Sequence, residues 1–208
     1  MADKKLIAIV QRHGSTVLNE DNKFRARLDP PLDDKGKKQA EEAAENLKSK
    51  DVELKRIISS PLLRAVQTAD IFADLYDLDV EQDRGIISWS LGFLAGKDKD
   101  EYADILELYV ENPKKVPPDG ESLDDFEQRN FEFFDKELRN DDKLTLYVTH
   151  NSNCVALNKM IDEEFTGKAE SDDVSVKPGG TLGVYLESDG AYSVEILFGQ
   201  TKEAEFGT

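Results

Sequence analysis

The 208-residue sequence contains one cysteine, Cys154, and two histidines, His13 and His150. A single cysteine cannot form an internal disulfide, and it excludes the cysteine-rich zinc modules. No apolar run approaches the roughly 18 residues that a membrane-spanning helix requires, and residues 1–5 lack the apolar core of a signal peptide. These absences predict a cytoplasmic protein without a disulfide framework, in which a metal site has few possible His or Cys ligands.

Basic residues are also scarce. The chain has 27 Lys and Arg against 44 Asp and Glu, a formal net charge of −17. Such a chain lacks the broad basic face that binds nucleic acid or anionic lipid non-specifically. We therefore expect no nucleic-acid partner and no membrane partner, and any anionic ligand must be bound by a local cluster of positive charge. Hydrophobic residues make up 38% of the chain, which is enough for a packed core.

Short apolar segments alternate with amphipathic ones along the chain. The pattern predicts strands over residues 6–10, 56–59, 79–82, 144–148, 181–186 and 192–197, the last two joined by a turn at Asp189-Gly190. It predicts helices from Asp33 or Asp34 to about 49, over 60–76, through 102–109 and ending before Pro113, over about 122–139, and over 155–161 after a turn at 149–152. Ser60 is the expected N-cap and Pro61 the expected first residue of the second helix. We expect an α/β protein, specifically a three-layer α/β/α sandwich with a mostly parallel central sheet and a C-terminal antiparallel hairpin. Residues 1–208 are interpreted as one domain, with a variable, substrate-covering insertion over about 86–120.

Three of these strands are followed by residues that can carry out chemistry. The first leads into Arg12-His13-Gly14, the second ends at Ser59-Ser60-Pro61, and the strand over 144–148 leads into Thr149-His150-Asn151. Ligands of parallel α/β sheets bind beyond the carboxyl ends of the strands. We therefore expect both histidines at one edge of the sheet, with Arg12 and with Arg64 from the first turn of a helix.

This combination suits phosphoryl transfer. A neutral imidazole is a nucleophile near pH 7, so a histidine at a strand end, such as His13, can accept a phosphoryl group. The guanidinium groups of Arg12 and Arg64 can bind phosphoryl oxygens bidentately and neutralise their charge. We expect His150 to be a second donor to the same group, and a helix that begins near Asn151 or Ser60 to add backbone N–H groups.

Further segments extend the pattern over residues 6–161. In chain order they are Arg12-His13-Gly14-Ser15-Thr16 with Asn19, Phe24-Arg25, Leu28-Asp29-Pro30-Pro31-Leu32, Gly36 with Gln39-Ala40, Ser59-Ser60-Pro61-Leu62-Leu63-Arg64-Ala65 with Gln67-Thr68-Ala69, Gly120-Glu121-Ser122, and Val148-Thr149-His150. In these segments the sequence resembles the histidine phosphatase superfamily, which includes cofactor-dependent phosphoglycerate mutases and many phosphatases.

The resemblance implies roles for particular residues. His13 is then the residue that becomes phosphorylated, Arg12, Arg64 and His150 hold the phosphoryl group, and neither a metal nor another cofactor is required. Arg25 falls where the family often places an additional substrate-facing residue. The matched segments add three further candidates for substrate binding, namely Asn19, Glu121 and Asn151.

The sequence departs from the family pattern around the general acid. Ser88 stands where the family often has a glutamate that protonates the leaving group, and Ser15 and Asn151-Ser152 also replace common family residues. Another carboxylate is one explanation, and the candidates are Asp98, Asp100, Glu101, Asp119 and Glu121. A leaving group that needs little acid assistance, such as that of an acyl phosphate or a phosphohistidine, is a second. A protein that binds without turnover is the third.

The sequence leaves three hypotheses for the function. The leading hypothesis is a phosphatase that hydrolyses phosphomonoesters through a phosphohistidine intermediate. The second is a phosphoglycerate mutase-type isomerase that returns the phosphoryl group to its substrate. The third is a catalytically impaired module that binds a phosphorylated ligand. The expected partner is a small phosphorylated substrate or a phosphoprotein.

Overall fold

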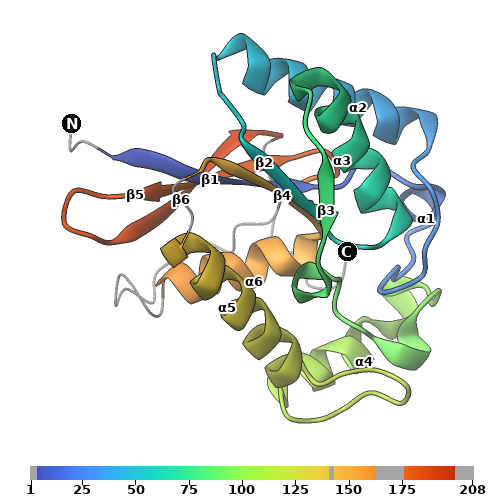
Figure 1. Ribbon diagram of the computed structural model, residues 1–208. Coiled ribbons are helices and arrows are strands. Elements are labelled where there is room, and N and C mark those ends of the chain that lie inside the picture. Colours follow the sequence, from blue (N-terminus) through green and yellow to red (C-terminus); the bar gives the residue numbers. More distant parts are fainter. Residues whose placement is uncertain (1–3, 141–142, 163–175, 200–208) are drawn as a thin grey trace.

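The computed structural model describes residues 4–140, 143–162 and 176–199. Its centre is a six-stranded sheet, which Figure 1 shows. The strands are β1 (Lys5–Arg12), β2 (Arg56–Ser59), β3 (Val80–Gln82), β4 (Thr145–Thr149), β5 (Thr181–Leu186) and β6 (Tyr192–Phe198). Their order is β3-β2-β4-β1-β5-β6. The pairs β2–β3, β2–β4 and β1–β4 are parallel, whereas β5 runs antiparallel to both β1 and β6. The predicted mostly parallel sheet with a C-terminal hairpin is confirmed.

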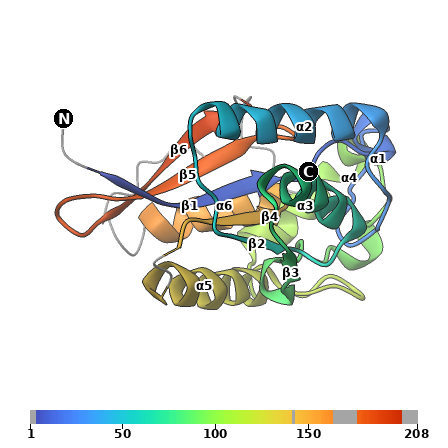
Figure 2. The same ribbon diagram turned by 45° about the horizontal axis from the view of Figure 1, so that its top comes forward.

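Helices cover both faces of this sheet. They are α1 (Val17–Glu20), α2 (Asp34–Ser49), α3 (Leu63–Tyr76), α4 (Lys99–Glu111), α5 (Leu123–Asn140) and α6 (Asn151–Ile161), with two short 3-10 helices, η1 (Arg84–Ile86) and η2 (Gly92–Leu94). Figure 2 shows α2 on one side of the sheet and α5 on the other. The three-layer α/β/α sandwich is therefore confirmed. In the described part of the chain, no helix combines the length and the apolar character needed to span a bilayer.

The apolar strands are buried on both faces, which explains their unbroken hydrophobic runs. In β1, Ile9 packs with residues of α2 and α3, whereas its neighbours Ala8 and Val10 pack with residues of α5 and α6. Successive strand residues point to opposite faces. The two resulting cores hold the carboxyl ends of β1, β2 and β4 in a fixed relation.

Residues 86–120 lie near the end of the sheet where β1 and β2 finish, and contain η2 and α4 (Figure 1). Trp89, Leu91 and Leu94 from this segment are buried in a third core with residues of α4 and α5. The Trp89 ring stacks on Phe126, with ring centroids 6.1 Å apart. This packing gives the segment fixed side chains beside the sheet edge.

The predicted starts of two helices are wrong. Helix α3 begins at Leu63 instead of Pro61, and its N-cap Leu62 makes no side-chain cap bond. The cap comes from a distant residue, because the Leu63 backbone N–H donates to Asp29 Oδ1 at 2.6 Å. Helix α6 begins at Asn151, directly after the N-cap His150. The start near Asn151 that was expected for anion binding is confirmed, whereas the later start at residue 155, after a turn over 149–152, is wrong. Helix α1 and both 3-10 helices were not predicted.

A close backbone contact joins the loop after β1 to the start of α2. A Cβ atom on Gly14 would lie 2.2 Å from Gly36 O, and one on Gly36 would lie 2.1 Å from Ser15 O. The contact is reinforced by Ser15 N–H, which donates to Gln39 Oε1 at 2.8 Å, and by Asp33, which caps α2. Both positions require glycine because the two backbone segments lie so close together. The contact fixes the backbone beside His13.

Gly36→Ala should therefore destabilise the protein by about 1–3 kcal/mol, because the added methyl group has no space against the backbone of the loop after β1. Urea denaturation measures the change. Lys38→Ala, an exposed substitution in the same helix, is the control and should stay within about 0.5 kcal/mol of the parent. Equal stability of Gly36→Ala and the parent would contradict the close contact.

Candidate active site

His13 lies directly after β1 and is held from both sides. Its backbone N–H donates to Thr149 O at 3.0 Å, and its backbone oxygen accepts from Gly179 N–H at 3.1 Å. The ring Nδ1 lies 2.6 Å from Gly14 O. A carbonyl oxygen can only accept, so Nδ1 carries the ring proton and Nε2 has a free electron pair.

The Arg64 side chain hydrogen-bonds both to His13 and to two backbone oxygens of the loop that follows Arg25. From the first turn of α3, its Nε–H donates to His13 Nε2 at 3.1 Å. Nη1 and Nη2 donate to the backbone oxygens of Leu28 and Ala26 at 2.6 and 2.9 Å. Burial is the main cause that lowers the pKa of Arg64 to about 10, so the guanidinium is charged at neutral pH. Arg64 thus places positive charge against the nitrogen that carries the free electron pair.

His150 is the second imidazole of the site. Its ring centroid lies 5.2 Å from that of His13. Arg64 Nη2 donates to His150 Nδ1 at 3.3 Å, and His150 Nε2 lies 2.7 Å from Ser60 Oγ. Because Nδ1 accepts, Nε2 holds the proton and donates it to Ser60 in this arrangement. The expected meeting of both histidines with Arg64 at one sheet edge is present in the structure.

Both histidines are held neutral. Burial is the largest cause that lowers the pKa of His13 and of His150 well below 6.5, followed by the charges of Arg64 and Arg25, and Arg12 acts in the same direction. A second proton on either ring would add charge where solvent is excluded and cations are near. His13 can therefore act as a nucleophile without first losing a proton.

Arg25 is the least satisfied charge of the site. It is 3% exposed, and its Nη1 has no hydrogen-bond partner among the described residues. Burial, and then the charges of Arg12 and Arg64, hold the pKa of this guanidinium well below its ordinary value. A buried cation without a partner is costly, and an anion bound beside it would remove much of that cost. Arg12 is also buried, and its Nη1 donates to Val176 O.

A small cavity of about 10 Å³ lies between the two histidines, Arg25 and Arg64, and Arg12 is not among the residues that line it. Its volume is comparable to the space that one water molecule needs. The cavity is lined by His13, Arg25, Ala26, Arg64, Ser88, Trp89, Leu91, His150 and Ser152. A phosphoryl group bound to His13 Nε2 must therefore displace Arg64 Nε from that atom and take over its hydrogen bonds. Ser152 comes from the first turn of α6, whose N-terminus favours negative charge.

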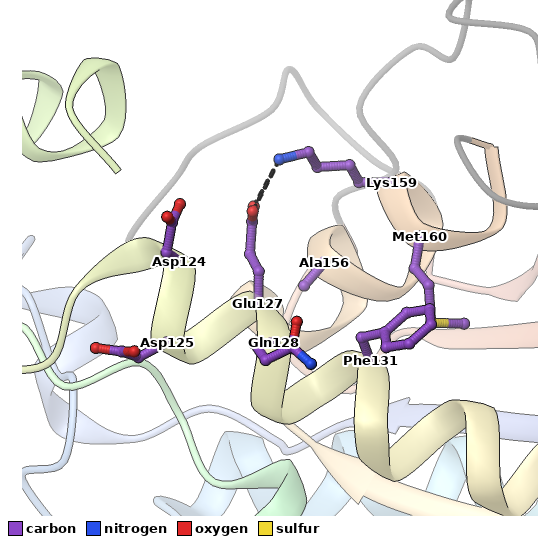
Figure 3. A pocket seen from close by; sticks show the side chains of 8 residues that line it. All are labelled: Asp124, Asp125, Glu127, Gln128, Phe131, Ala156, Lys159 and Met160. Carbon is purple, nitrogen blue, oxygen red and sulfur yellow. Dashed lines mark hydrogen bonds and ion pairs between the residues drawn. The ribbon is translucent and has the colours of Figure 1, made fainter. Parts of the chain in front are cut away.

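A larger groove of about 480 Å³ lies elsewhere, between α5 and α6. Figure 3 shows its acidic side chains, Asp124, Asp125 and Glu127, and the ion pair between Glu127 and Lys159. None of the residues predicted for the site lines this groove. Its size alone does not relate it to phosphoryl chemistry.

Three predicted substrate-binding residues lie outside the lining of the small cavity. Asn19 Oδ1 accepts from Thr16 N–H at 2.9 Å and caps α1. Asn151 is fully buried at the start of α6. Glu121 Oε1 accepts from Arg27, Arg129 and the Ser90 backbone N–H at 2.7, 3.0 and 3.0 Å. That network holds the wall around Ser88, because Arg27 Nε also donates to Ser88 O.

The sequence pattern assigns Ser60 to a helix cap and Ser152 to a turn, and it does not reveal that Ser60 bonds His150 or that Ser152 lines the cavity. Both follow strand ends at the predicted edge, and that position was the only available signal. The described residues contain no group of three or more His, Cys, Asp or Glu side chains arranged to hold a metal ion.

Comparison with known proteins identifies the family. The model of the histidine phosphatase superfamily (branch 1) matches residues 8–166. The chain belongs to this superfamily. A 2,3-bisphosphoglycerate-dependent phosphoglycerate mutase of Thermoplasma acidophilum is 31% identical over 147 residues, which cover 70% of this chain and 70% of that protein.

Other relatives carry phosphatase names. Phosphoserine phosphatase 1 of Hydrogenobacter thermophilus is 35% identical over 121 residues, which cover 55% of this chain and 56% of that protein. The chain thus spans little more than half the length of several curated relatives. A mycobacterial glucosyl-3-phosphoglycerate phosphatase, solved with VO3, has the same fold, with a TM-score of 0.76 and 20% identity over 92% of this chain and 98% of that one.

The unpartnered Arg25 gives a direct test of anion binding. Arg25→Met keeps much of the side-chain volume and removes the buried charge, so it should leave the stability in phosphate-free buffer equal or higher. It should also weaken phosphate binding by at least roughly tenfold, because a hydrogen-bonded charge is lost.

Thermal unfolding at increasing phosphate concentration measures both effects. At a phosphate concentration of 100 times Kd, the parent should gain about 2.7 kcal/mol. Lys23→Met removes a charge two residues away, on a partly exposed side chain, and should respond to phosphate as the parent does. Full phosphate stabilisation of Arg25→Met would show that Arg25 does not bind the anion.

Proposed function

We propose that the protein is a phosphatase that hydrolyses small phosphorylated substrates through a phosphohistidine at His13. The observation that carries this proposal is the geometry of the ring. Nδ1 is bound to Gly14 O, and the unprotonated Nε2 faces a cavity lined by Arg25 and Arg64. A nucleophile with its electron pair directed at an anion-binding cavity is what attack on phosphorus requires.

In the first step, the phosphoryl oxygens take over hydrogen bonds from Arg64 and bind the free donor of Arg25. His13 Nε2 attacks phosphorus opposite the leaving group, and the charge on the oxygens is stabilised by Arg12, Arg25 and Arg64. Water then attacks the phosphohistidine, the N–P bond breaks, and phosphate leaves. The guanidinium groups stabilise both steps, because the same oxygens carry negative charge in each.

His150 takes part through a change in its hydrogen bonds. When a phosphoryl oxygen takes over Arg64 Nη2, His150 Nδ1 no longer accepts from it. If the ring proton then moves to Nδ1, Ser60 Oγ–H can donate to Nε2 and Nδ1–H can donate to the phosphoryl group. Ser60 is 2.7 Å away and serves either direction of the bond. We assign Ser60 as the residue that positions His150.

Residues 86–120 form the substrate-covering segment in this proposal. Ser88, Trp89 and Leu91 supply one wall of the cavity, and the Glu121 network with Arg27 and Arg129 holds this wall in place. Glu121 thus positions the wall instead of contacting the phosphoryl group. We expect Asn19 and Asn151 to support the loops that carry the site.

Mutase activity is the second candidate, because one relative named as a mutase matches 70% of this chain. Isomerisation of a phosphoglycerate in the presence of a bisphosphorylated primer measures it. We expect phosphate release without isomerisation, since the cavity wall has serine at position 88 and the hydrolytic step needs only water. Isomerisation faster than phosphate release would make the protein a mutase.

His13→Ala should abolish turnover of an aryl phosphate and also the covalent intermediate. The assay is run without added metal, and samples quenched without acid are examined by intact mass. The parent should show an adduct with the mass of one phosphoryl group, and His13→Ala should show none. Lys38→Ala, on the exposed face of α2, should form the adduct as the parent does. An adduct that survives in His13→Ala would place the nucleophile elsewhere.

A further inference from the structure

The wall of the His13 cavity offers no acid to the leaving group. Among the described residues that line it, none is Asp or Glu. The ionisable side chains that line the cavity are the neutral imidazoles of His13 and His150 and the guanidinium groups of Arg25 and Arg64. Guanidinium groups keep their protons, and a neutral imidazole is a poor proton donor. The cavity therefore stabilises negative charge strongly but has no carboxylic acid to donate a proton.

Asp29, Glu121 and Asp119 do not line the cavity, and the first two accept hydrogen bonds elsewhere. Asp29 Oδ1 accepts from Leu63 N–H at 2.6 Å at the start of α3 and is 4.0 Å from Arg64 Nη1. Glu121 Oε1 accepts three hydrogen bonds in the network with Arg27 and Arg129. Asp119 is exposed and lines an open hollow with Leu28 and Phe93, and this hollow shares Ala26 with the His13 cavity. None of the three is among the residues that line the His13 cavity.

A cavity without an acid affects leaving groups differently, according to whether they need a proton to depart. An alkoxide is strongly basic, and its departure from phosphorus requires a proton in the transition state. A carboxylate or a phenolate is weakly basic and departs as an anion. We propose that the site is selective for phosphoryl compounds whose leaving group departs without a proton, namely acyl phosphates and aryl phosphates, over alkyl phosphates. This inference rests on the proposed function of His13.

The reaction balances without a protein acid. His13 Nε2 forms the N–P bond while the bond from phosphorus to the leaving oxygen breaks, and that oxygen departs with the electron pair. Water then attacks phosphorus, the N–P bond breaks, and its electron pair returns to Nε2. The proton of the attacking water passes to solvent, and the products are phosphate and the free carboxylate or phenolate.

A series of aryl phosphates tests the proposal, with acetyl phosphate and an alkyl phosphate as the two extremes. The quantity to measure is kcat/KM, because it reports formation of the phosphohistidine and excludes the later hydrolysis, which is common to all substrates. The inference predicts that kcat/KM falls roughly tenfold for each unit rise in the pKa of the leaving phenol. A fall of less than about threefold per unit would overturn it.

Position 88 provides a matched pair of variants. Ser88 lines the cavity, so Ser88→Glu places a carboxyl group beside the leaving oxygen, whereas Ser88→Gln has the same size without the acid. Ser88→Glu should raise kcat/KM for the alkyl phosphate at least about tenfold over Ser88→Gln and flatten the dependence on leaving-group pKa. Circular dichroism establishes that both variants are folded, and the slope of the parent tests the inference even if they are not.

Asp119→Asn tests whether this exposed carboxylate, from the hollow that shares Ala26 with the cavity, donates the proton. The inference predicts the same slope as in the parent, and a slope that steepens in Asp119→Asn would overturn it by identifying Asp119 as the donor.

Failure of the proposed function has a different signature. In that case no substrate, acetyl phosphate included, would give turnover or a phosphoryl adduct. Adduct formation with a shallow slope would contradict only the leaving-group selectivity.

Discussion

The hydrogen bond from Arg64 Nε to His13 Nε2 depends on one condition, which is that His13 is neutral. A protonated Nε2 cannot accept, and it would face Arg12, Arg25 and Arg64 without a counterion. Burial and these cations therefore stabilise one tautomer, with the proton on Nδ1 at Gly14 O. The position of the ring depends in turn on the ends of β1 and β4 and on the contact between the loop after β1 and α2. The chemistry of the site is thus a consequence of how the sheet edge is packed.

The acidic composition and the basic site are compatible because they occupy different places. The chain has a net charge of −17, yet the cavity wall among the described residues has cationic and neutral groups only. Arg25 is kept there at a cost in stability, since its Nη1 has no partner among these residues. Natural proteins accept such costs at functional sites, where a ligand supplies the missing interaction. The same cavity attracts a phosphoryl group and lacks the acid that an alkoxide leaving group requires.

Much of the fold follows from local sequence patterns. The bounds of β2 and β5, the α2 start after Asp33 and the meeting of both histidines with Arg64 are confirmed, because apolar runs, caps and strand ends are local signals. The start of α3 was wrong because Asp29, 34 residues away from Leu63, supplies the cap. Ser60 then bonds His150 instead of capping α3. The Glu121 network and the contact of Gly14 with Gly36 likewise depend on tertiary packing, which no local pattern reveals.

The state of His13 is the central claim, and NMR of the two histidine rings measures it directly. Long-range proton–nitrogen spectra of the nitrogen-15-labelled protein give the tautomer and the titration of each ring. Because the pKa of His13 lies well below 6.5, the ring should stay neutral as the pH falls through 6.5, with the proton on Nδ1. A His13 ring that titrates near 6.5, or that carries its proton on Nε2, would contradict a nucleophile held ready by the surrounding arginines.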